Sequence, residues 1–456
     1  MADTIKLKKG FDINLAGKAE KTIGKFSQPK TFAIKPSDFI GMERAKELVQ
    51  VGDVVKAGTP LLFDKKAEGI LYTSPVSGEV VEVKRGAKRA LIQIVVLADA
   101  HNEYEDFKKF SVSEASTITR EESIGLLKKS GIWPQIIQRP FGVVANPEDS
   151  PKSIFISAFD THPLAPDYDF LFKGEEKYFQ VGVDVLNKLT KGNVHINVDA
   201  QAEVSNVFVN ARNVQINKFS GPHPTGNVGV QIHHVDPIGK EDVVWTINPY
   251  GVIQIGKLLL EGKYKASKKI ALAGSEVSNP QYIETYMGAN VEGFLTNNLK
   301  QDNVRVISGN ILTGTAIEKN DFLGFYDHLI SVIPEGDKAR FFATEGWLAP
   351  TTRVSFHKAF GLFSFLQGNK EHVMDTSTNG EERAFVMTGT FEKVMPMDIL
   401  PTYLFKAIMA EDYEDMEALG LFEVVEEDVA LCEFVDVSKH DLQHLVRQGI
   451  ELFRKG

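Results

Sequence analysis

The sequence predicts a multidomain α/β protein whose four regions follow one another along the chain. Three observations indicate this. Paired glycine-containing turns separate short apolar runs in roughly the first hundred residues, strand and helix patterns alternate from about residue 102, and roughly the last hundred residues show mainly helical apolar spacing. With 456 residues, 43% hydrophobic and 25% charged, the chain has globular composition and enough length for about two to four domains.

Composition excludes several classes of protein. A net charge of −10 argues against a nucleic-acid binder. The single cysteine, Cys432, excludes a disulfide framework and any four-cysteine zinc or iron–sulfur site, and fits a reducing cytoplasm. The N-terminus has no signal-peptide pattern, and no stretch approaches the roughly 18–20 apolar residues that span a bilayer. If the protein works at a membrane, we expect a partner to hold it there.

Residues 1–101 are predicted to form a β domain. Segments 51–62 and 74–81 place Gly-Asp and Ser-Gly turns between short strands, a pairing that resembles the biotinyl/lipoyl barrel-sandwich module. A carrier of this type presents Met-Lys-Met at a hairpin tip, but segment 63–69 contains no methionine. We therefore expect Lys65 and Lys66 to be solvated lysines of a turn. A covalently modified Lys65 or Lys66 is the alternative.

Residues 102–262 are predicted to form a Rossmann-like α/β domain. A capping box at 119–122 begins a helix, and the predicted strands are 153–158, 194–198, 214–219 and 243–247, with helices at 178–189 and 252–260. This βαβ order implies a parallel sheet, so the Pro/His loops at 160–167 and 220–226 should share one edge. His162 shows no partner that would make it a general base, and we expect a hydrogen-bonded loop histidine.

A Gly/Pro-rich loop follows the strand at 214–219, where open α/β sheets place ligands. Its prolines remove backbone donors, and its G-x4-G-x2-G spacing matches neither dinucleotide nor P-loop patterns. We expect a degenerate nucleotide loop without a cofactor, formed by Gly221, Pro222, His223, Pro224, Gly226 and Gly229. A metal site using His223, His233 and His234 is the alternative. Their spacing fits no zinc pattern, so no metal is expected.

Residues 263–345 are predicted to form a small β-grasp domain. Strands are expected at 269–274 and 304–308, one helix at roughly 280–295, and further β-structure at 323–333 and 339–343. Residues 346–456 are predicted to be mainly helical, and the final helix carries an apolar face.

Five segments carry a resemblance that covers essentially the whole chain. They are 72–78 with 85–89, 139–141, 220–224 with Gly226 and Gly229, 391–398, and 427–435. In this order and spacing the sequence resembles the A-subunit family of sodium-translocating NADH:quinone oxidoreductases. That family is similar to the flavin-bearing NADH-dehydrogenase subunit of complex I and to its counterpart in the Rnf complex, which bind FMN and NADH and carry cysteine-ligated clusters. The β-grasp region is correspondingly SLBB-like.

The resemblance implies a cytoplasmic subunit that binds no cofactor covalently or tightly and is inactive alone. It would lie peripherally on the inner face of the bacterial inner membrane, held by membrane and flavin-bearing subunits. Those partners would carry NADH oxidation, FMN, FAD, iron–sulfur clusters and sodium transport. The family often has a second cysteine after Cys432, but this chain has Asp436 there. That departure excludes a redox pair, and we expect a buried thiol.

The resemblance also implies a role in quinone binding or access. Segments 36–42 and 136–141 match stretches that the family places near quinone. The residues predicted to contribute are Phe39, Gly41, Met42, Arg139 and Phe141. The aromatic and methionine side chains would line an apolar slot, and the arginine would polarise a quinone carbonyl. Alternatively, these side chains are core and an ion-pair partner. Two other functions stay open: a docking scaffold without a pocket, and a stand-alone flavin- or NADH-binding dehydrogenase.

Overall fold

A computed structural model describes residues 4–202, 204–337, 356 and 370–455. Its centre is a seven-stranded sheet with the order β1-β14-β13-β12-β15-β10-β11. The first five strands are mutually parallel, and β10 and β11 run antiparallel at one edge. The strand bounds are β1 Thr4–Lys6, β10 Ile136–Arg139, β11 Val143–Val144, β12 Ser153–Ser157, β13 Asn193–Asp199, β14 Gln215–Ser220 and β15 Val244–Ile247. The predicted parallel sheet is present, with an antiparallel edge that was not predicted.

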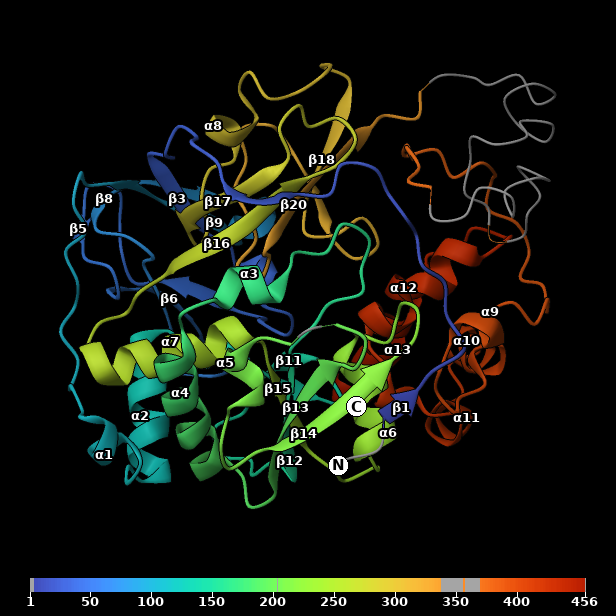
Figure 1. The fold of residues 1–456 in the computed structure, drawn as a ribbon, viewed down its shortest axis with the longest axis horizontal. Helices are drawn as coiled ribbons and strands as arrows, with labels where there is room; N and C mark the ends of the chain where they lie inside the picture. Colours follow the sequence, from blue (N-terminus) through green and yellow to red (C-terminus); the bar gives the residue numbers. More distant parts are fainter. Residues whose placement is uncertain (1–3, 203, 338–355, 357–369, 456) are drawn as a thin grey trace.

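Helices cover both faces of this sheet (Figure 1). One face carries α2 (Arg120–Ser130), α4 (Glu176–Leu189) and α7 (Pro249–Glu261), and the other carries α6 (Val228–Val235) and helices of the C-terminal region. The predicted capping box is confirmed, because the Thr119 side chain caps α2 and Glu122 bonds back to it. Three short helices complete this region: α1 Val112–Ala115, α3 Tyr168–Phe172 and α5 Asn206–Val209.

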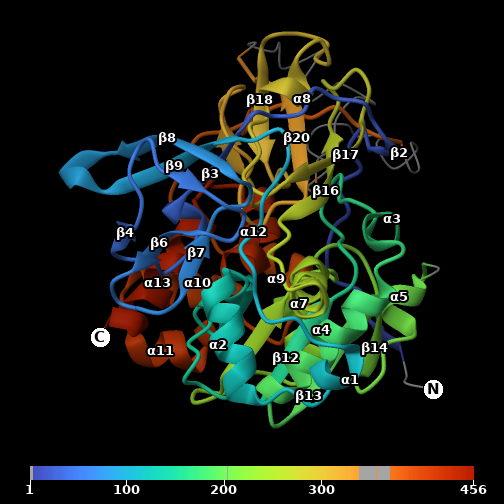
Figure 2. The ribbon, with the colours of Figure 1, turned by 90° about the vertical axis from the view of Figure 1, so that its left-hand side faces the viewer.

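The barrel-sandwich region contains two small sheets, ordered β3-β9-β8-β5 and β4-β6-β7. Their strands are β3 Thr31–Ile34, β4 Ala45–Glu47, β5 Val54–Val55, β6 Pro60–Asp64, β7 Leu71–Thr73, β8 Gly78–Arg85 and β9 Leu91–Ala98. Fully buried Leu61, Leu62 and Ile94 contribute to the core between them. The β8–β9 hairpin extends away from the body of the molecule (Figure 2).

The β-grasp region forms a six-stranded sheet, β19-β18-β20-β16-β17-β2, in which β16 and β20 are parallel and central. The strands are β2 Glu20–Ile23, β16 Ser267–Ala273, β17 Gln281–Tyr286, β18 Val304–Ser308, β19 Thr315–Ile317 and β20 Leu329–Pro334. The helix predicted at 280–295 is wrong over most of its length. Residues 281–286 form a strand, because aromatic and β-branched side chains there pack in the sheet, and only α8 (Glu292–Leu295) is helical. Residues 339–343 lie outside the described part.

The N-terminal segment crosses from one region to another. Strand β1 adds to the edge of the seven-stranded sheet beside β14, and β2 pairs with β17. Both strands precede the barrel-sandwich strands in the sequence. The first residues of the chain therefore belong to the sheets of the α/β and β-grasp regions, and the barrel-sandwich region begins after them. The predicted domain boundaries stay predictions.

The described part of the last region is helical between residues 391 and 455 (Figure 1). Its helices are α9 Phe391–Val394, α10 Pro401–Met409, α11 Tyr413–Ala418, α12 Glu426–Val435 and α13 Leu442–Lys455. Cys432 is buried in α12, as predicted, and burial raises the pKa of its thiol. This bundle packs beside α6, which brings α12 to the edge of the sheet that bears the glycine-rich loop.

Candidate functional site

Two Pro/His loops meet at the carboxyl edge of the seven-stranded sheet, as the sequence predicted. The rings of His162 and His223 lie 4.7 Å apart, centroid to centroid. Thr161 Oγ1 lies 3.1 Å from His223 Nδ1 and accepts a hydrogen bond from the Gly226 amide. The loop after β12 and the loop after β14 therefore form one connected rim.

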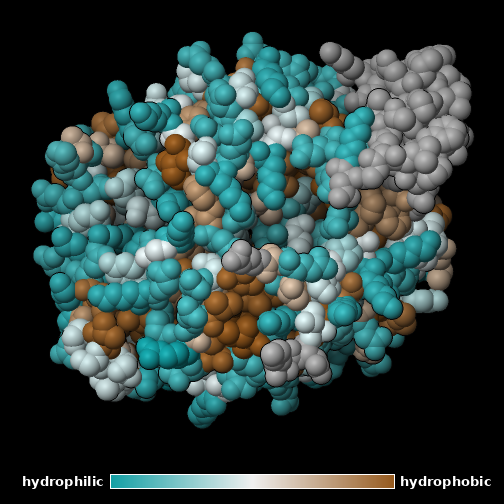
Figure 3. Space-filling model, in the orientation of Figure 1, coloured by the Kyte–Doolittle hydropathy of each residue, from teal (hydrophilic) through white to brown (hydrophobic). Residues whose placement is uncertain are grey.

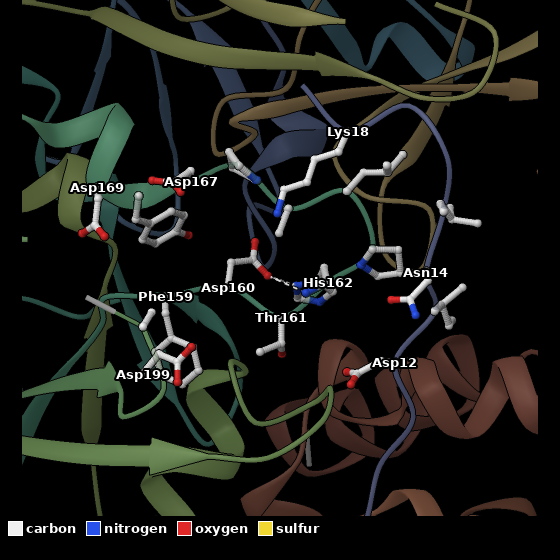
Figure 4. A pocket seen from close by; sticks show the side chains of 18 of the residues that line it. Asp12, Asn14, Lys18, Phe159, Asp160, Thr161, His162, Asp167, Asp169 and Asp199 are labelled. Carbon is white, nitrogen blue, oxygen red and sulfur yellow. Dashed lines mark hydrogen bonds and ion pairs between the residues drawn. The ribbon is translucent and has the colours of Figure 1, made fainter. Parts of the chain in front are cut away.

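His162 has a partner that the sequence analysis did not find. Its Nδ1 lies 2.6 Å from Asp160 Oδ1, and Figure 4 shows the pair in the pocket beside Thr161. Burial opposes protonation of His162, but the Asp160 carboxylate outweighs it and raises the pKa of the imidazole. Burial and the neighbouring His162 lower the pKa of His223 to about 3. The hydrogen-bonded His162–Asp160 pair thus lies beside a neutral His223.

The pocket in Figure 4 has a volume of about 610 Å³ and is strongly acidic. Its carboxylates come from the N-terminal segment, from the loop after β12 and from the end of β13. They are Asp12, Asp160, Asp167, Asp169 and Asp199, and Glu371 from the C-terminal part of the chain also lines the pocket. Such a lining repels phosphate groups. No group of three or more His, Cys, Asp or Glu suited to a metal ion occurs among the described residues.

The amides of the glycine-rich loop are engaged within the protein. The His223 amide donates to Asp12 Oδ1 at 2.8 Å, and the Thr225 and Asn227 amides donate to the carbonyls of Pro222 and Pro224. A phosphate cradle needs several amides directed at the anion. The histidines of the metal alternative are also committed: His233 Nδ1 lies 2.6 Å from Glu423, and His234 Nε2 lies 2.8 Å from the Pro396 carbonyl.

A carboxylate of the chain lies against the N-terminus of α6. A Cβ atom built on Gly229 would lie 2.4 Å from both carboxylate oxygens of Asp428, which comes from α12. Asp428 is buried and pairs with Arg139 at 2.8 Å, and the same guanidinium bonds Glu427 at 2.8 Å. The carboxylate lies beside the first turn of α6, while its hydrogen bonds come from Arg139 and from the Val425 amide.

A second cavity, of about 440 Å³, contains two of the residues predicted for quinone binding, Gly41 and Met42. It lies where the barrel-sandwich region, α2, β11 and the end of α13 meet. The apolar lining includes Ile40, Met42, Ile70, Tyr72, Val143 and Val144, and the charged lining consists of Lys66, Lys128 and Arg454 with Asp64, Glu68 and Glu148. Arg454 also donates to the Gly41 carbonyl at 3.0 Å. Of the two predicted segments, 36–42 lines this cavity, whereas 136–141 does not, and the lining on that side begins at Val143.

The other three predicted residues lie beside this cavity rather than in its lining. Phe39 is 2% exposed and packs on Tyr72, Phe325 and Tyr326, with ring centroids 4.4–6.0 Å apart. Arg139 holds α12, and Phe141 packs on Phe422 at 6.5 Å. Phe39 thus supports Tyr72, which does line the cavity. A role for all five residues in quinone binding stays a prediction.

Known proteins resemble this chain along its full length. Family models described as "NqrA N-terminal barrel-sandwich hybrid domain", "NqrA second alpha/beta domain" and "NQRA C-terminal domain" match residues 5–99, 118–264 and 269–319. The A-subunit of the Na(+)-translocating NADH-quinone reductase of Neisseria meningitidis serogroup B is 37% identical over 452 residues, with 99% of each chain covered. The protein of the same name from Vibrio alginolyticus is 37% identical over 453 residues, also with 99% of each covered. The chain belongs to this A-subunit family.

Membership of the A-subunit family confirms the predicted barrel-sandwich and α/β regions. Among solved structures, an NAD⁺-reducing [NiFe]-hydrogenase in the air-oxidised state gives a TM-score of 0.40 at 11% identity, covering 76% of this chain and 68% of that one. No inference rests on that likeness.

Asp38, which precedes the cavity residue Gly41 by three positions, is a carboxyl group with a raised pKa. Asp38 ends the 3-10 helix Pro36–Asp38, and its side chain is 15% exposed. Burial raises the pKa of Asp38 to about 6, against the attraction of Lys35. Because the folded state holds this proton more tightly than the unfolded state, Asp38 contributes stability at low pH that is lost as pH rises from about 4 through 6.

Asp38→Asn should remove that pH dependence. The free energy of unfolding of the variant minus that of the unsubstituted chain should be about 2–3 kcal/mol higher at pH 7 than at pH 4. Chemical denaturation of both proteins at the two pH values measures this. Asp302→Asn, at a fully exposed side chain, is the control and should gain less than about 0.5 kcal/mol. An equal difference at both pH values would contradict the prediction.

Proposed function

We propose that this chain is the quinone-access subunit of a sodium-translocating NADH:quinone reductase, and that it carries no tightly bound cofactor. The cavity at Gly41 and Met42 is the observation that supports the quinone role. Its apolar walls suit the ring and tail of a quinone, and its cations suit the two carbonyl oxygens. Phe39 positions Tyr72, while Arg139 and Phe141 hold the neighbouring β10–β11 turn against the C-terminal helices.

In this proposal sister subunits oxidise NADH, hold FMN, FAD and iron–sulfur clusters, and move sodium. The engaged loop amides and the Asp428 carboxylate on Gly229 support the absence of a nucleotide cofactor. The chain would be bound peripherally at the cytoplasmic face of the membrane. Among the described helices, none has the length and apolar character to cross a bilayer, and the face shown in Figure 3 is mostly hydrophilic. The isolated protein should show no flavin absorption.

Met42→Trp should fill part of the cavity and weaken quinone binding. In the assembled complex we expect the KM for quinone to rise about tenfold, or about 1.4 kcal/mol, while NADH oxidation by a soluble artificial acceptor stays unchanged. Steady-state kinetics of the purified complex measure both. Met409→Trp is the matched control, because Met409 is 45% exposed on α10 and does not line the cavity.

The same experiment separates the quinone role from a docking scaffold. An unchanged KM in a complex that assembles normally would refute quinone binding at this cavity. If Met42→Trp lowers the yield of assembled complex but leaves the quinone KM of that complex unchanged, the docking scaffold is the correct function. Flavin recovered at about one per purified chain would instead support a stand-alone dehydrogenase.

A further inference from the structure

A third cavity, of about 280 Å³, lies at the point where the order of the parallel strands reverses. From β12 the chain continues to β13 and β14 on one side, and then returns to place β15 on the other side of β12. The pairing of β12 with β15 ends at Phe155 and Thr246, and Ser157 and Thr246 both line the cavity. Open α/β sheets bind ligands in the crevice at this switch point. We call it the switch crevice.

The switch crevice contains polar atoms without partners. Gln135 Nε2, His162 Nε2 and Asn227 Oδ1 are buried without a hydrogen bond, and all three residues line it. Gln135 is 4% exposed and Asn227 is 2% exposed. Unpaired buried polar groups are rare because each costs about 1–3 kcal/mol. The Gln135 amide nitrogen is a donor and the Asn227 amide oxygen is an acceptor, while His162 Nε2 donates or accepts according to the protonation of the ring, so the set suits a ligand that offers both an acceptor and a donor.

Asn227 is unusual for its position in the fold. It is the N-cap residue of α6, where an asparagine side chain ordinarily accepts a hydrogen bond from an amide of the first helical turn. Here its Oδ1 makes no such bond, and its Nδ2 donates to the Glu427 carbonyl at 2.9 Å. The side chain is held toward α12 and does not cap its own helix.

The charges around the switch crevice restrict its ligand. The carboxylates of Asp160, Asp327 and Glu427 line it, and Asp428 lies on Gly229 at the start of α6. His162 pairs with Asp160, and Arg139 pairs with both Glu427 and Asp428, but the carboxylates outnumber these cations and a phosphate would meet their excess. The rings of Phe159, Tyr168 and Tyr326 offer aromatic surfaces to a planar group. The volume of about 280 Å³ lies just below the usual range for small-molecule sites, which is about 300–1,000 Å³, and so favours a small ligand.

We infer that the switch crevice binds an uncharged, planar, hydrogen-bonding ligand of the nucleoside class and rejects the corresponding phosphate ester. The ring lies among the aromatic side chains, and its heteroatoms pair with Gln135, His162 and Asn227. The fold thus retains a ligand crevice at the usual place, with the phosphate position taken by its own carboxylates. This site is separate from the quinone cavity and does not depend on it.

Matched pairs of ligands test the inference with the full-length chain. Equilibrium dialysis compares adenosine with AMP, uridine with UMP, and nicotinamide riboside with nicotinamide mononucleotide. We expect at least one nucleoside to bind with a Kd below about 1 mM and its phosphate ester to bind at least about tenfold more weakly. Gln135→Leu should weaken nucleoside binding about tenfold, whereas Gln93→Leu, at a buried glutamine of the barrel sandwich, should not.

Several outcomes would overturn the inference. They are the absence of binding by all three nucleosides at about 1 mM, equal or tighter binding of the phosphate esters, and binding that Gln135→Leu leaves intact. Should Gln135→Leu fail to fold, as judged by circular dichroism, Asn227→Ser replaces it. Serine also caps a helix, so this variant withdraws the amide while it preserves α6, and it is expected to weaken binding to a similar degree.

Discussion

Arg139→Met should lower the free energy of unfolding by about 3–5 kcal/mol, a large share of a typical domain's stability. The substitution leaves Asp428 buried without its cationic partner, since its side chain is 0% exposed and the Arg139 side chain is 3% exposed. A buried pair is strongly destabilised when one member is removed, because the remaining charge stays desolvated. Chemical denaturation of the full-length chain measures the loss.

Two further variants establish the cause. Arg305→Met removes an arginine of the same kind from a pair with Glu335 in which the arginine side chain is 41% exposed, and it should cost less than about 1 kcal/mol. Adding Asp428→Asn to Arg139→Met should recover most of the loss, because the uncompensated charge is then absent. A loss below about 1 kcal/mol for Arg139→Met would show that α12 is not held by this pair.

Gly182→Ala and Gly256→Ala should each lower the free energy of unfolding by about 1–3 kcal/mol through overpacking. The two glycines lie where α4 and α7 cross. A Cβ atom on Gly182 would lie 2.0 Å from the Val252 carbonyl oxygen, and one on Gly256 would lie 1.9 Å from that of Tyr178. Because both obstacles are backbone, the helices must move apart, which loosens the cover on one face of the central sheet.

Gly125→Ala is the matched control for this pair. Gly125 lies in α2 with nothing within 4 Å of a built Cβ, so alanine should raise stability by about 0.5–1 kcal/mol through helix propensity. The same substitution is thus expected to have opposite signs at crossing and non-crossing positions. Thermal or chemical denaturation that shows Gly182→Ala and Gly256→Ala as stable as the parent would contradict the close crossing.

Much of the fold follows from local pattern. The alternation of apolar and polar residues in segment 214–219, the apolar run at 154–156 and the capping box at Thr119 were enough to place strands and a helix. The meeting of the two Pro/His loops was also predictable, because parallel strands put their carboxyl ends on one edge. The prediction failed at 281–286. The aromatic and β-branched residues there favour the strand that the structure contains, but a helix was predicted.

The candidate sites depend on contacts that no local pattern reports. The Arg139–Asp428 bond joins residues 289 positions apart, and Asp428 reaches Gly229 only because α12 packs beside α6. The cavity at Gly41 and Met42 likewise takes its lining from four separated regions of the chain.

The sequence by itself determined the order of the regions, most strands and helices, and the prolines that remove donors from the glycine-rich loop. The tertiary structure alone decided that Gly41 and Met42 line a cavity while Phe39 is core, and that the Asp428 carboxylate lies beside the first turn of α6. The physical reason is that periodicity records whether a residue is buried, whereas the partner it meets depends on packing between segments far apart in the chain.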